Sequence, residues 1–283
     1  MHSITRPMAW LMVAAGLAQG ATAFAQPATP WTEGYNSKTR LLAGRALLGA
    51  ERLAVVGVEI ALAPGWKTYW RAPGDSGGVP PSFDLSRSKN LASATVHYPA
   101  PHRMVDAAGE AVGYKGGVIF PIEVVAADRA KPIALEVVIE YGICREICVP
   151  AEARMSLVLD PAGLAAAPAA ITAALETVPR AAGKRRPTDP ELKAVTAVLA
   201  GDKPRIEIEA VFPGSGEGAD VFVEASEGIY LPLPRRIGAG AGPALRFEID
   251  LATGVEPAEL KGKTLTITLV SATGQSEAAR TID

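Results

Sequence analysis

The segment "IALEVVIEYGICREICVPAEARMSLVLD", residues 133–160, predicts two β-strands joined by a short turn that holds both cysteines of the chain. Residues 133–142 alternate mostly between hydrophobic and polar side chains and are rich in β-branched residues, and residues 153–160 continue the pattern. A period of two is typical of strands that bury one face. We therefore expect the first strand to run into a small loop around Cys144 and Cys148 at the end of a sheet.

Similar runs along the chain predict an all-β protein. They are rich in β-branched residues and are bounded by glycine or proline, of which the sequence contains 28 and 23. These runs are residues 52–62, 94–100, 117–126, 204–212, 219–226, 229–234, 244–251 and 264–271. The later runs have the spacing of strands in a β-sandwich, so two tandem all-β domains are the simplest organisation.

An alanine- and proline-rich segment between the two sets of strands, residues 163–189, predicts a linker. A short helix is expected from about Pro168 to Val178, because proline suits the first turn of a helix. A helix packed on the first domain is the alternative to a free linker. The expected organisation is one sandwich in residues 26–162 and a second in residues 190–283.

Residues 1–25 have the layout of a secretory signal peptide. Arg6 precedes an apolar run from Met8 to about Leu17, and the small-residue pattern Ala23-Phe24-Ala25 follows. This run is too short to span a bilayer, and no later run is long enough, so we expect an exported, soluble protein without direct membrane insertion. An exported chain meets oxidising conditions, in which cysteine pairs can form disulfides.

The charge of the chain gives no electrostatic reason to expect nucleic acid or an anionic membrane as a partner. Lysine and arginine number 28 against 30 aspartates and glutamates, a formal net charge of −2. Hydrophobic residues make up 48% of the chain, which is enough for a packed core that needs no disulfide.

Cys144 and Cys148 are compatible with a redox-active disulfide, a local structural bridge or part of a metal site. Four extended residues span about 13 Å, too far for a disulfide, so the chain must turn between them if they pair. Pro150 is expected to interrupt the regular strand ladder just beyond this turn. A ring this small stabilises a fold by only about 2 kcal/mol, which favours a redox role over a structural one.

A zinc site would need His97 and His102 to converge on the two cysteines. The spacing of the histidines is compatible with this but unspecific. Two surface histidines beside a turn are the simpler interpretation, so neither a metal nor a cofactor is expected.

Three blocks of the sequence resemble, in the right order, the N-terminal periplasmic domain of the thiol:disulfide interchange protein DsbD, most closely its ScsB branch, the copper-sensitivity suppressors. They are "GWKTYWRAPGDSGGVPPSFDL", "VHYPAPHRMVDAAGEAVGYKGGVIFPIEV" and "IEYGICREICVPAEA", within residues 35–160. The later strands resemble the second part of the ScsB N-terminal region. The resemblance implies an all-β fold of two tandem immunoglobulin-like β-sandwich domains.

The resemblance also implies a function and a compartment. A domain of this kind is a periplasmic protein-disulfide reductase that uses one cysteine pair. It takes electrons from a membrane-embedded DsbD- or ScsB-type donor and passes them to thioredoxin-like periplasmic proteins.

The resemblance further implies the site residues. The family's cysteine pair falls on Cys144 and Cys148, and Cys148 is implied to form the mixed disulfide with partners. A tyrosine-bearing strand beside the cysteines falls on "KTYW", which indicates Tyr69. A cap loop that shields the cysteines falls on "DAAGEAVGYKGG", where Tyr114 is the nearby aromatic candidate.

The sequence departs from DsbD in several ways. The gap between its cysteines is shorter, its cap lacks an aromatic pair, and it contains neither the transmembrane nor the C-terminal thioredoxin-like domain. No Cys-x-x-Cys motif occurs, so the chain is not expected to be a thioredoxin fold itself.

A non-catalytic periplasmic protein-binding module with a structural disulfide is the alternative function. Under either interpretation the residues from 190 onward are expected to contribute no redox chemistry, because they contain no cysteine, histidine or methionine.

Overall fold

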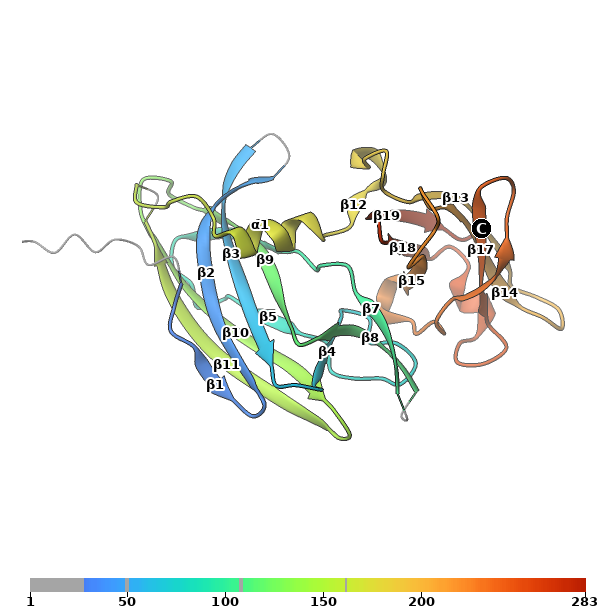
Figure 1. The fold of residues 1–283 in the computed structure, drawn as a ribbon, viewed down its shortest axis with the longest axis horizontal. Helices are drawn as coiled ribbons and strands as arrows, with labels where there is room; N and C mark the ends of the chain where they lie inside the picture. Colours follow the sequence, from blue (N-terminus) through green and yellow to red (C-terminus); the bar gives the residue numbers. More distant parts are fainter. Residues whose placement is uncertain (1–27, 49–50, 107–108, 161) are drawn as a thin grey trace, which may run out of the picture.

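The structure, a computed structural model, describes residues 28–48, 51–106, 109–160 and 162–283. The expected signal peptide, residues 1–25, lies outside the described residues. Nearly all regular structure is β-strand, so the predicted all-β fold is confirmed. Figure 1 shows two groups of sheets side by side, which we call the N-terminal unit (β1–β11) and the C-terminal unit (β12–β19).

The N-terminal unit consists of two facing sheets in the described part of the chain. The first has the order β1-β2-β3-β9-β6, with β1 (Thr32–Gly34), β2 (Ser37–Leu48), β3 (Glu51–Leu62), β9 (Gly117–Ala126) and β6 (Leu91–Val96). The second has the order β11-β10-β4-β8-β7, with β5 paired to β10. Its strands are β11 (Cys148–Leu159), β10 (Ile133–Cys144), β4 (Lys67–Tyr69), β8 (Gly109–Lys115), β7 (His102–Asp106) and β5 (Ser82–Asp84).

Alternation of side chains builds the core between these two sheets. In β9, Phe120, Ile122 and Val124 are all 3% exposed or less, and they point inward at every second position. In β10, Val137 and Ile139 do the same from the facing sheet. Burial of one face of each strand is therefore what fixes the register of both sheets.

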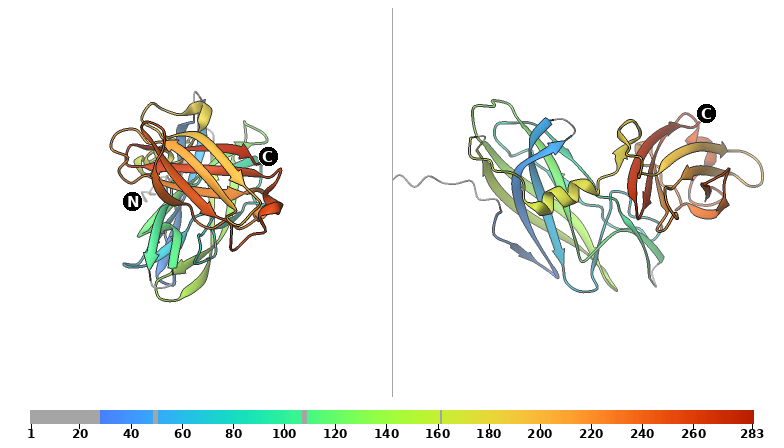
Figure 2. Two further views of the ribbon diagram at one scale, coloured as in Figure 1. Left: turned by 90° about the vertical axis from the view of Figure 1, so that its right-hand side faces the viewer. Right: turned by 45° about the horizontal axis from the view of Figure 1, so that its top comes forward.

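Helix α1 (Ala169–Glu176) covers the outer face of the first sheet, as the right-hand view of Figure 2 shows. Its Ile171 is fully buried in a cluster with Leu42 and Val55. Gly57 makes this close approach possible, because a Cβ there would lie 3.0 Å from the Ile171 side chain. The segment predicted as a linker thus contains the expected helix, and the helix packs on the N-terminal unit.

The C-terminal unit is a second pair of sheets. In the described residues one has the order β12-β19-β18-β15 and the other β13-β14-β17-β16. The strands are β12 (Arg180–Ala181), β13 (Glu191–Val198), β14 (Arg205–Val211), β15 (Asp220–Ala225), β16 (Arg235–Ala239), β17 (Ala244–Asp250), β18 (Thr264–Ser271) and β19 (Gly274–Thr281). Short 3₁₀ helices span Ala182–Lys184, Ser226–Gly228 and Pro257–Leu260. A separate core of Ile, Leu, Val and Phe side chains lies between the sheets.

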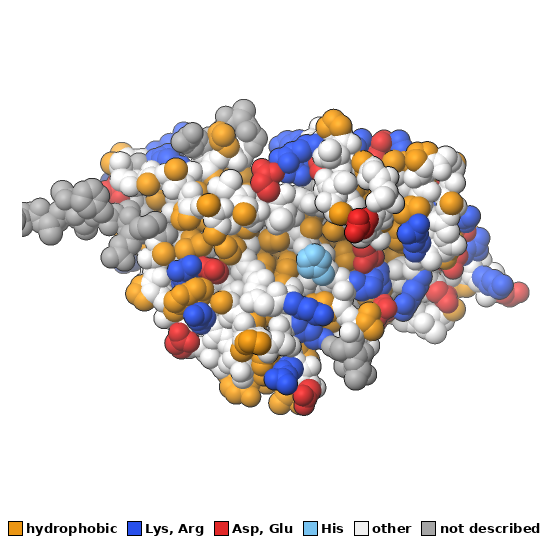
Figure 3. Space-filling view, in the orientation of Figure 1, with side chains coloured by type: hydrophobic (Ala, Val, Ile, Leu, Met, Phe, Trp, Pro, Cys, Tyr) orange, Lys and Arg blue, Asp and Glu red, His pale blue; other side chains and the backbone are white. Residues whose placement is uncertain are grey.

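Ion pairs and apolar contacts join the two units. Arg103 on β7 donates two hydrogen bonds to the Asp220 carboxylate, at 2.8 and 3.0 Å. Arg71 pairs with both Glu224 and Glu277. Figure 3 shows acidic and basic side chains interspersed on the visible face of this junction. Phe222 of the C-terminal unit packs into the core of the N-terminal unit, so the two units share buried surface.

Two strand predictions are wrong in their details. Pro150 does not interrupt the β10–β11 ladder. Its partner Gly142 donates its N–H to the Val79 carbonyl and not to β11, and β11 is an edge strand of its sheet, where proline is tolerated. Residues 229–234 form no strand. Prolines limit the ladder hydrogen bonds of that segment, and the Leu233 N–H donates to the Asp75 carboxylate at 3.0 Å instead.

We predict that a chain ending at Pro187 still folds cooperatively but is less stable than the full chain. The truncation removes Phe222 and Leu233 from the first core, which costs roughly 3 kcal/mol at about 1.5 kcal/mol for each side chain. Urea unfolding of both chains measures this difference. A truncated chain without a cooperative transition would show that the C-terminal unit is required for the N-terminal fold.

Candidate functional site

Cys144 and Cys148 are the last residue pair of the β10–β11 hairpin. Twelve consecutive pairs join the two strands, from Ile133↔Leu159 to Cys144↔Cys148. Residues 145–147 turn the chain, which brings the two Cα atoms to 4.2 Å, and a disulfide joins the sulfurs. The disulfide therefore lies at the tip of a hairpin, at the end of its sheet (Figure 1).

The two cysteines differ in exposure. Cys144 is 5% exposed and packs against Tyr69, Met104 and Ala111, whereas Cys148 is exposed. Disulfide exchange needs attack along an open path to one sulfur. Only Cys148 offers such a path, because β4 and β8 cover Cys144.

Tyr69 contacts the exposed cysteine. It is 2% exposed, and its hydroxyl lies 3.1 Å from the Cys148 sulfur, to which it donates a hydrogen bond in the disulfide form. Strand β4 lies between β10 and β8, with Thr68 opposite Ile143 and Tyr69 opposite Gly113. Thr68 therefore faces the core and Tyr69 faces the cysteines.

Glycines make room for the Tyr69 ring. Gly78 has φ +149° in the loop after β4, and a Cβ there would lie 2.4 Å from the ring. A Cβ at Gly113 would lie 2.0 Å from the carbonyl oxygen of Thr68. Gly78 therefore leaves room for the ring, and Gly113 allows β8 to lie close to the backbone of β4.

Tyr114 lies on the opposite face of the sheet from the cysteines. It pairs with Thr68, packs against Phe120 in the core, and donates a hydrogen bond from its hydroxyl to the Pro99 carbonyl at 2.8 Å. Burial raises the pKa of Tyr114 well above its ordinary value. The structure thus brings Tyr69 to the disulfide but not Tyr114. The tip of the expected cap, residues 107–108, lies outside the described residues.

The surface around Cys148 is partly apolar. Ile147 is 67% exposed and Val79 is 48% exposed. Arg145 lies 3.9 Å from the Glu146 carboxylate and is itself exposed, so solvent and this carboxylate screen its charge. A basic neighbour in the sequence can favour a cysteine thiolate, but the exposed position of Arg145 offers little support for such an effect on Cys144.

Lys67, Met104 and Ala111 are neighbours of Cys144 that the sequence analysis did not single out. Lys67 is buried and lies directly opposite Cys144 in the β4–β10 ladder. Met104 and Ala111 face each other on β7 and β8. Nothing in the local sequence signals these positions, because strand pairing over long separations creates them.

The two histidines lie in different surroundings. His97 follows β6 and lies 3.8 Å from the Glu123 carboxylate, while His102 begins β7 opposite Gly113. Burial lowers the pKa of His97, and Glu123 partly offsets this effect. The described residues include no group of three or more His, Cys, Asp or Glu side chains arranged to hold a metal ion.

The part of the chain that carries this site matches a known protein family. Residues 45–160 match the family described as "Thiol:disulfide interchange protein DsbD, N-terminal". The resemblance to DsbD is confirmed for this part of the chain. The match includes β4, β8 and the β10–β11 hairpin, so the disulfide and Tyr69 both lie within the matched residues.

A solved structure resembles almost the whole chain. It is the crystal structure of the N-terminal periplasmic domain of ScsB from Proteus mirabilis, with a TM-score of 0.67 and 22% sequence identity. The alignment covers 90% of this chain and 98% of that domain, so both units share its fold. No curated protein sequence matches this chain. In the part of the chain that the structure describes, no helix is long and apolar enough to cross a membrane.

We predict that Tyr69→Phe raises the pKa of the Cys148 thiol in the reduced protein by about one unit. The Tyr69 hydroxyl can donate to the thiolate, and a hydrogen bond to a charged group contributes about 1.5–3 kcal/mol, where 1.36 kcal/mol equals one unit. Thiolate absorbance against pH measures the change. Tyr114→Phe is the matched control and should leave this pKa unchanged. Equal effects of the two variants would contradict the assignment.

Reduction of the disulfide should lower the free energy of unfolding by about 2 kcal/mol or less, because the closed ring is short. Urea unfolding of the oxidised and reduced protein tests this. Loss of the cooperative transition on reduction would mean that the disulfide is a structural bridge.

Proposed function

We propose that this chain is a periplasmic thiol:disulfide oxidoreductase, or protein-disulfide reductase, with Cys144 and Cys148 as its redox pair. The observation that supports this most is the asymmetry of the disulfide, in which Cys148 is exposed and Cys144 is 5% exposed. The match of residues 45–160 to a thiol:disulfide interchange family supports the same chemistry.

The exchange proceeds in two steps. In the reduced protein the Cys148 thiolate attacks one sulfur of the partner's disulfide, which forms a mixed disulfide and releases the other partner sulfur as a thiolate. The Cys144 thiolate then attacks the Cys148 sulfur. This step restores the Cys144–Cys148 disulfide, releases the partner as a dithiol, and completes the transfer of two electrons.

Tyr69 assists this exchange without forming a covalent bond itself. Its hydroxyl donates to the Cys148 sulfur, so it stabilises negative charge there when Cys148 attacks and when Cys148 leaves. The ring itself lies close to Gly78, where there is no room for a side chain.

We propose the partners from the resemblance to DsbD and from the exposed surface beside Cys148. A thioredoxin-like periplasmic protein is the acceptor, and a membrane-embedded DsbD- or ScsB-type domain is the donor. The exposed Ile147 beside Cys148 gives such a partner an apolar contact next to the reacting sulfur. Export by the predicted signal peptide would bring the chain to the periplasm.

We predict that Cys144→Ser accumulates a reducible adduct with a thioredoxin-like protein, because the remaining Cys148 can form the mixed disulfide but no resolving thiol is present. Cys148→Ser should accumulate much less, since Cys144 is covered by β4 and β8. Non-reducing electrophoresis after mixing with the oxidised partner measures the adduct.

The matched control is the double variant Cys144→Ser/Cys148→Ser, which should form no adduct. Equal trapping by the two single variants would show that the roles of the cysteines are shared. No trapping by either variant would favour the non-catalytic module with a structural disulfide.

A further inference from the structure

A pocket opens at the end of the N-terminal unit far from the disulfide. It lies where β10 begins and β11 ends, at the pair Ile133↔Leu159. The disulfide lies at the other end of the same hairpin, about 36 Å away at a rise of roughly 3.3 Å per residue. The pocket is therefore separate from the redox site.

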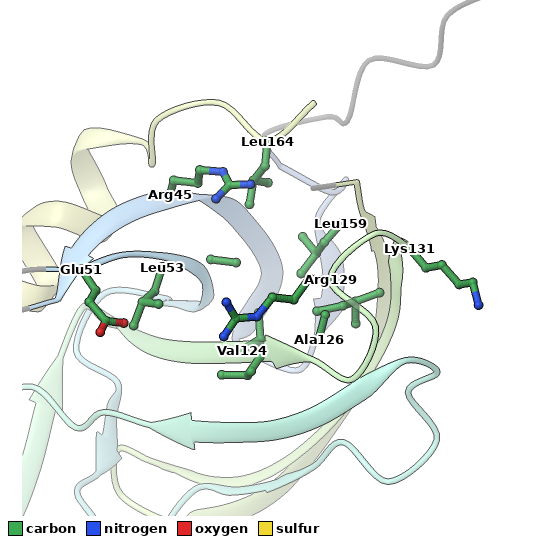
Figure 4. Close-up of a pocket in the computed structure, with 12 residues that line it drawn as sticks. Arg45, Glu51, Leu53, Val124, Ala126, Arg129, Lys131, Leu159 and Leu164 are labelled. Atoms are coloured by element: carbon green, nitrogen blue, oxygen red, sulfur yellow. The ribbon is translucent and has the colours of Figure 1, made fainter. Parts of the chain in front are cut away.

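The walls of this pocket are apolar and come from both sheets. Its volume is about 300 Å³, at the lower end of the range for ligand pockets, about 300–1,000 Å³. Val124, Ile133 and Leu159 form the buried floor, at 3–4% exposed, and Leu53 and Leu164 line the sides. Figure 4 shows Val124, Leu159, Leu53 and Leu164 around an open space between the strands.

The rim of the pocket carries cationic side chains. Arg45, Arg129 and Lys131 lie there together with one carboxylate, Glu51. Lys131 is paired with Asp128 at 3.0 Å and extends away from the pocket, whereas Arg129 extends across it (Figure 4). Among the described residues none forms a hydrogen bond or ion pair with the Arg129 guanidinium, so its five donors are available to a ligand.

We propose that this pocket binds an anionic amphiphile with a single acyl chain, with the chain on the apolar floor and the anionic headgroup on Arg129. An apolar pocket with a few polar groups at its mouth is the usual form of a small-molecule site, and the polar groups fix the orientation of the ligand. A guanidinium matches a carboxylate or a phosphate by two parallel hydrogen bonds. The opening to solvent lies beside the rim, so the headgroup stays hydrated while the chain is buried.

The headgroup chemistry could come from a free fatty acid or from a phospholipid surface. Calorimetry of the full chain with decanoate, and flotation with phosphatidylglycerol vesicles, separate the two sources. We expect saturable binding of decanoate with one site for each chain. The vesicles should bind less, because the pocket has room for one short chain.

Two variants and a matched control locate the site. Arg129→Ala should weaken decanoate binding about tenfold, as expected for loss of a charge-assisted hydrogen bond. Ala126→Phe should abolish binding because it fills the pocket. Arg236→Ala, on β16 of the other unit, should leave binding unchanged. Decyltrimethylammonium, which has the same chain and the opposite charge, should not bind.

Chemical-shift mapping on the unmodified protein keeps the test independent of whether the variants fold. Decanoate should shift the methyl signals of Val124 and Leu159 and leave those of Ile147, beside the disulfide, in place. Absence of saturable binding, equal binding of the cationic amphiphile, or binding to vesicles alone would each overturn the proposal.

Discussion

The register of the β10–β11 hairpin is the constraint on which the rest of the N-terminal unit depends. Twelve residue pairs in continuous register place Val137 and Ile139 in the core, and the same register ends with Cys144 opposite Cys148. A slip by one residue would turn these core side chains to solvent, so burial of the strand and pairing of the cysteines are set together. The disulfide therefore adds little to a hairpin that packing already determines, which suits a bond that opens and closes.

The short strand β4 connects this hairpin to the rest of the second sheet and separates two environments. Thr68 faces the core, where Tyr114 is its neighbour, and Tyr69 faces the sulfurs. Because residues on one strand alternate between faces, a single strand can support the core and contact the disulfide at once. The C-terminal unit is joined behind this strand through Trp70, whose ring lies 5.8 Å from that of Phe222.

The sequence predicted strands well where β-branched residues are dense and poorly where distant contacts decide the conformation. Residues 117–126 were predicted with the bounds that β9 has, because they are rich in valine and isoleucine. Strand β2 was not predicted, since Leu41 to Gly44 are all buried and no alternation is visible there. The cause is long-range, because residues 165–167 and α1 cover the outer face of that strand. The error at residues 229–234 has a similar origin, in hydrogen bonds to Asp75 from a distant loop.

Local pattern and motif were enough to predict the all-β fold, the turn between the cysteines and the resemblance to DsbD, because strand periodicity and residue spacing are properties of short segments. They could not establish which sulfur is exposed, nor that Tyr69 and not Tyr114 reaches it. Both outcomes depend on which strands become neighbours across the sheet, with Lys67 opposite Cys144 and Gly113 opposite Tyr69. Such pairings join residues far apart in the chain, and only the packed tertiary structure selects them.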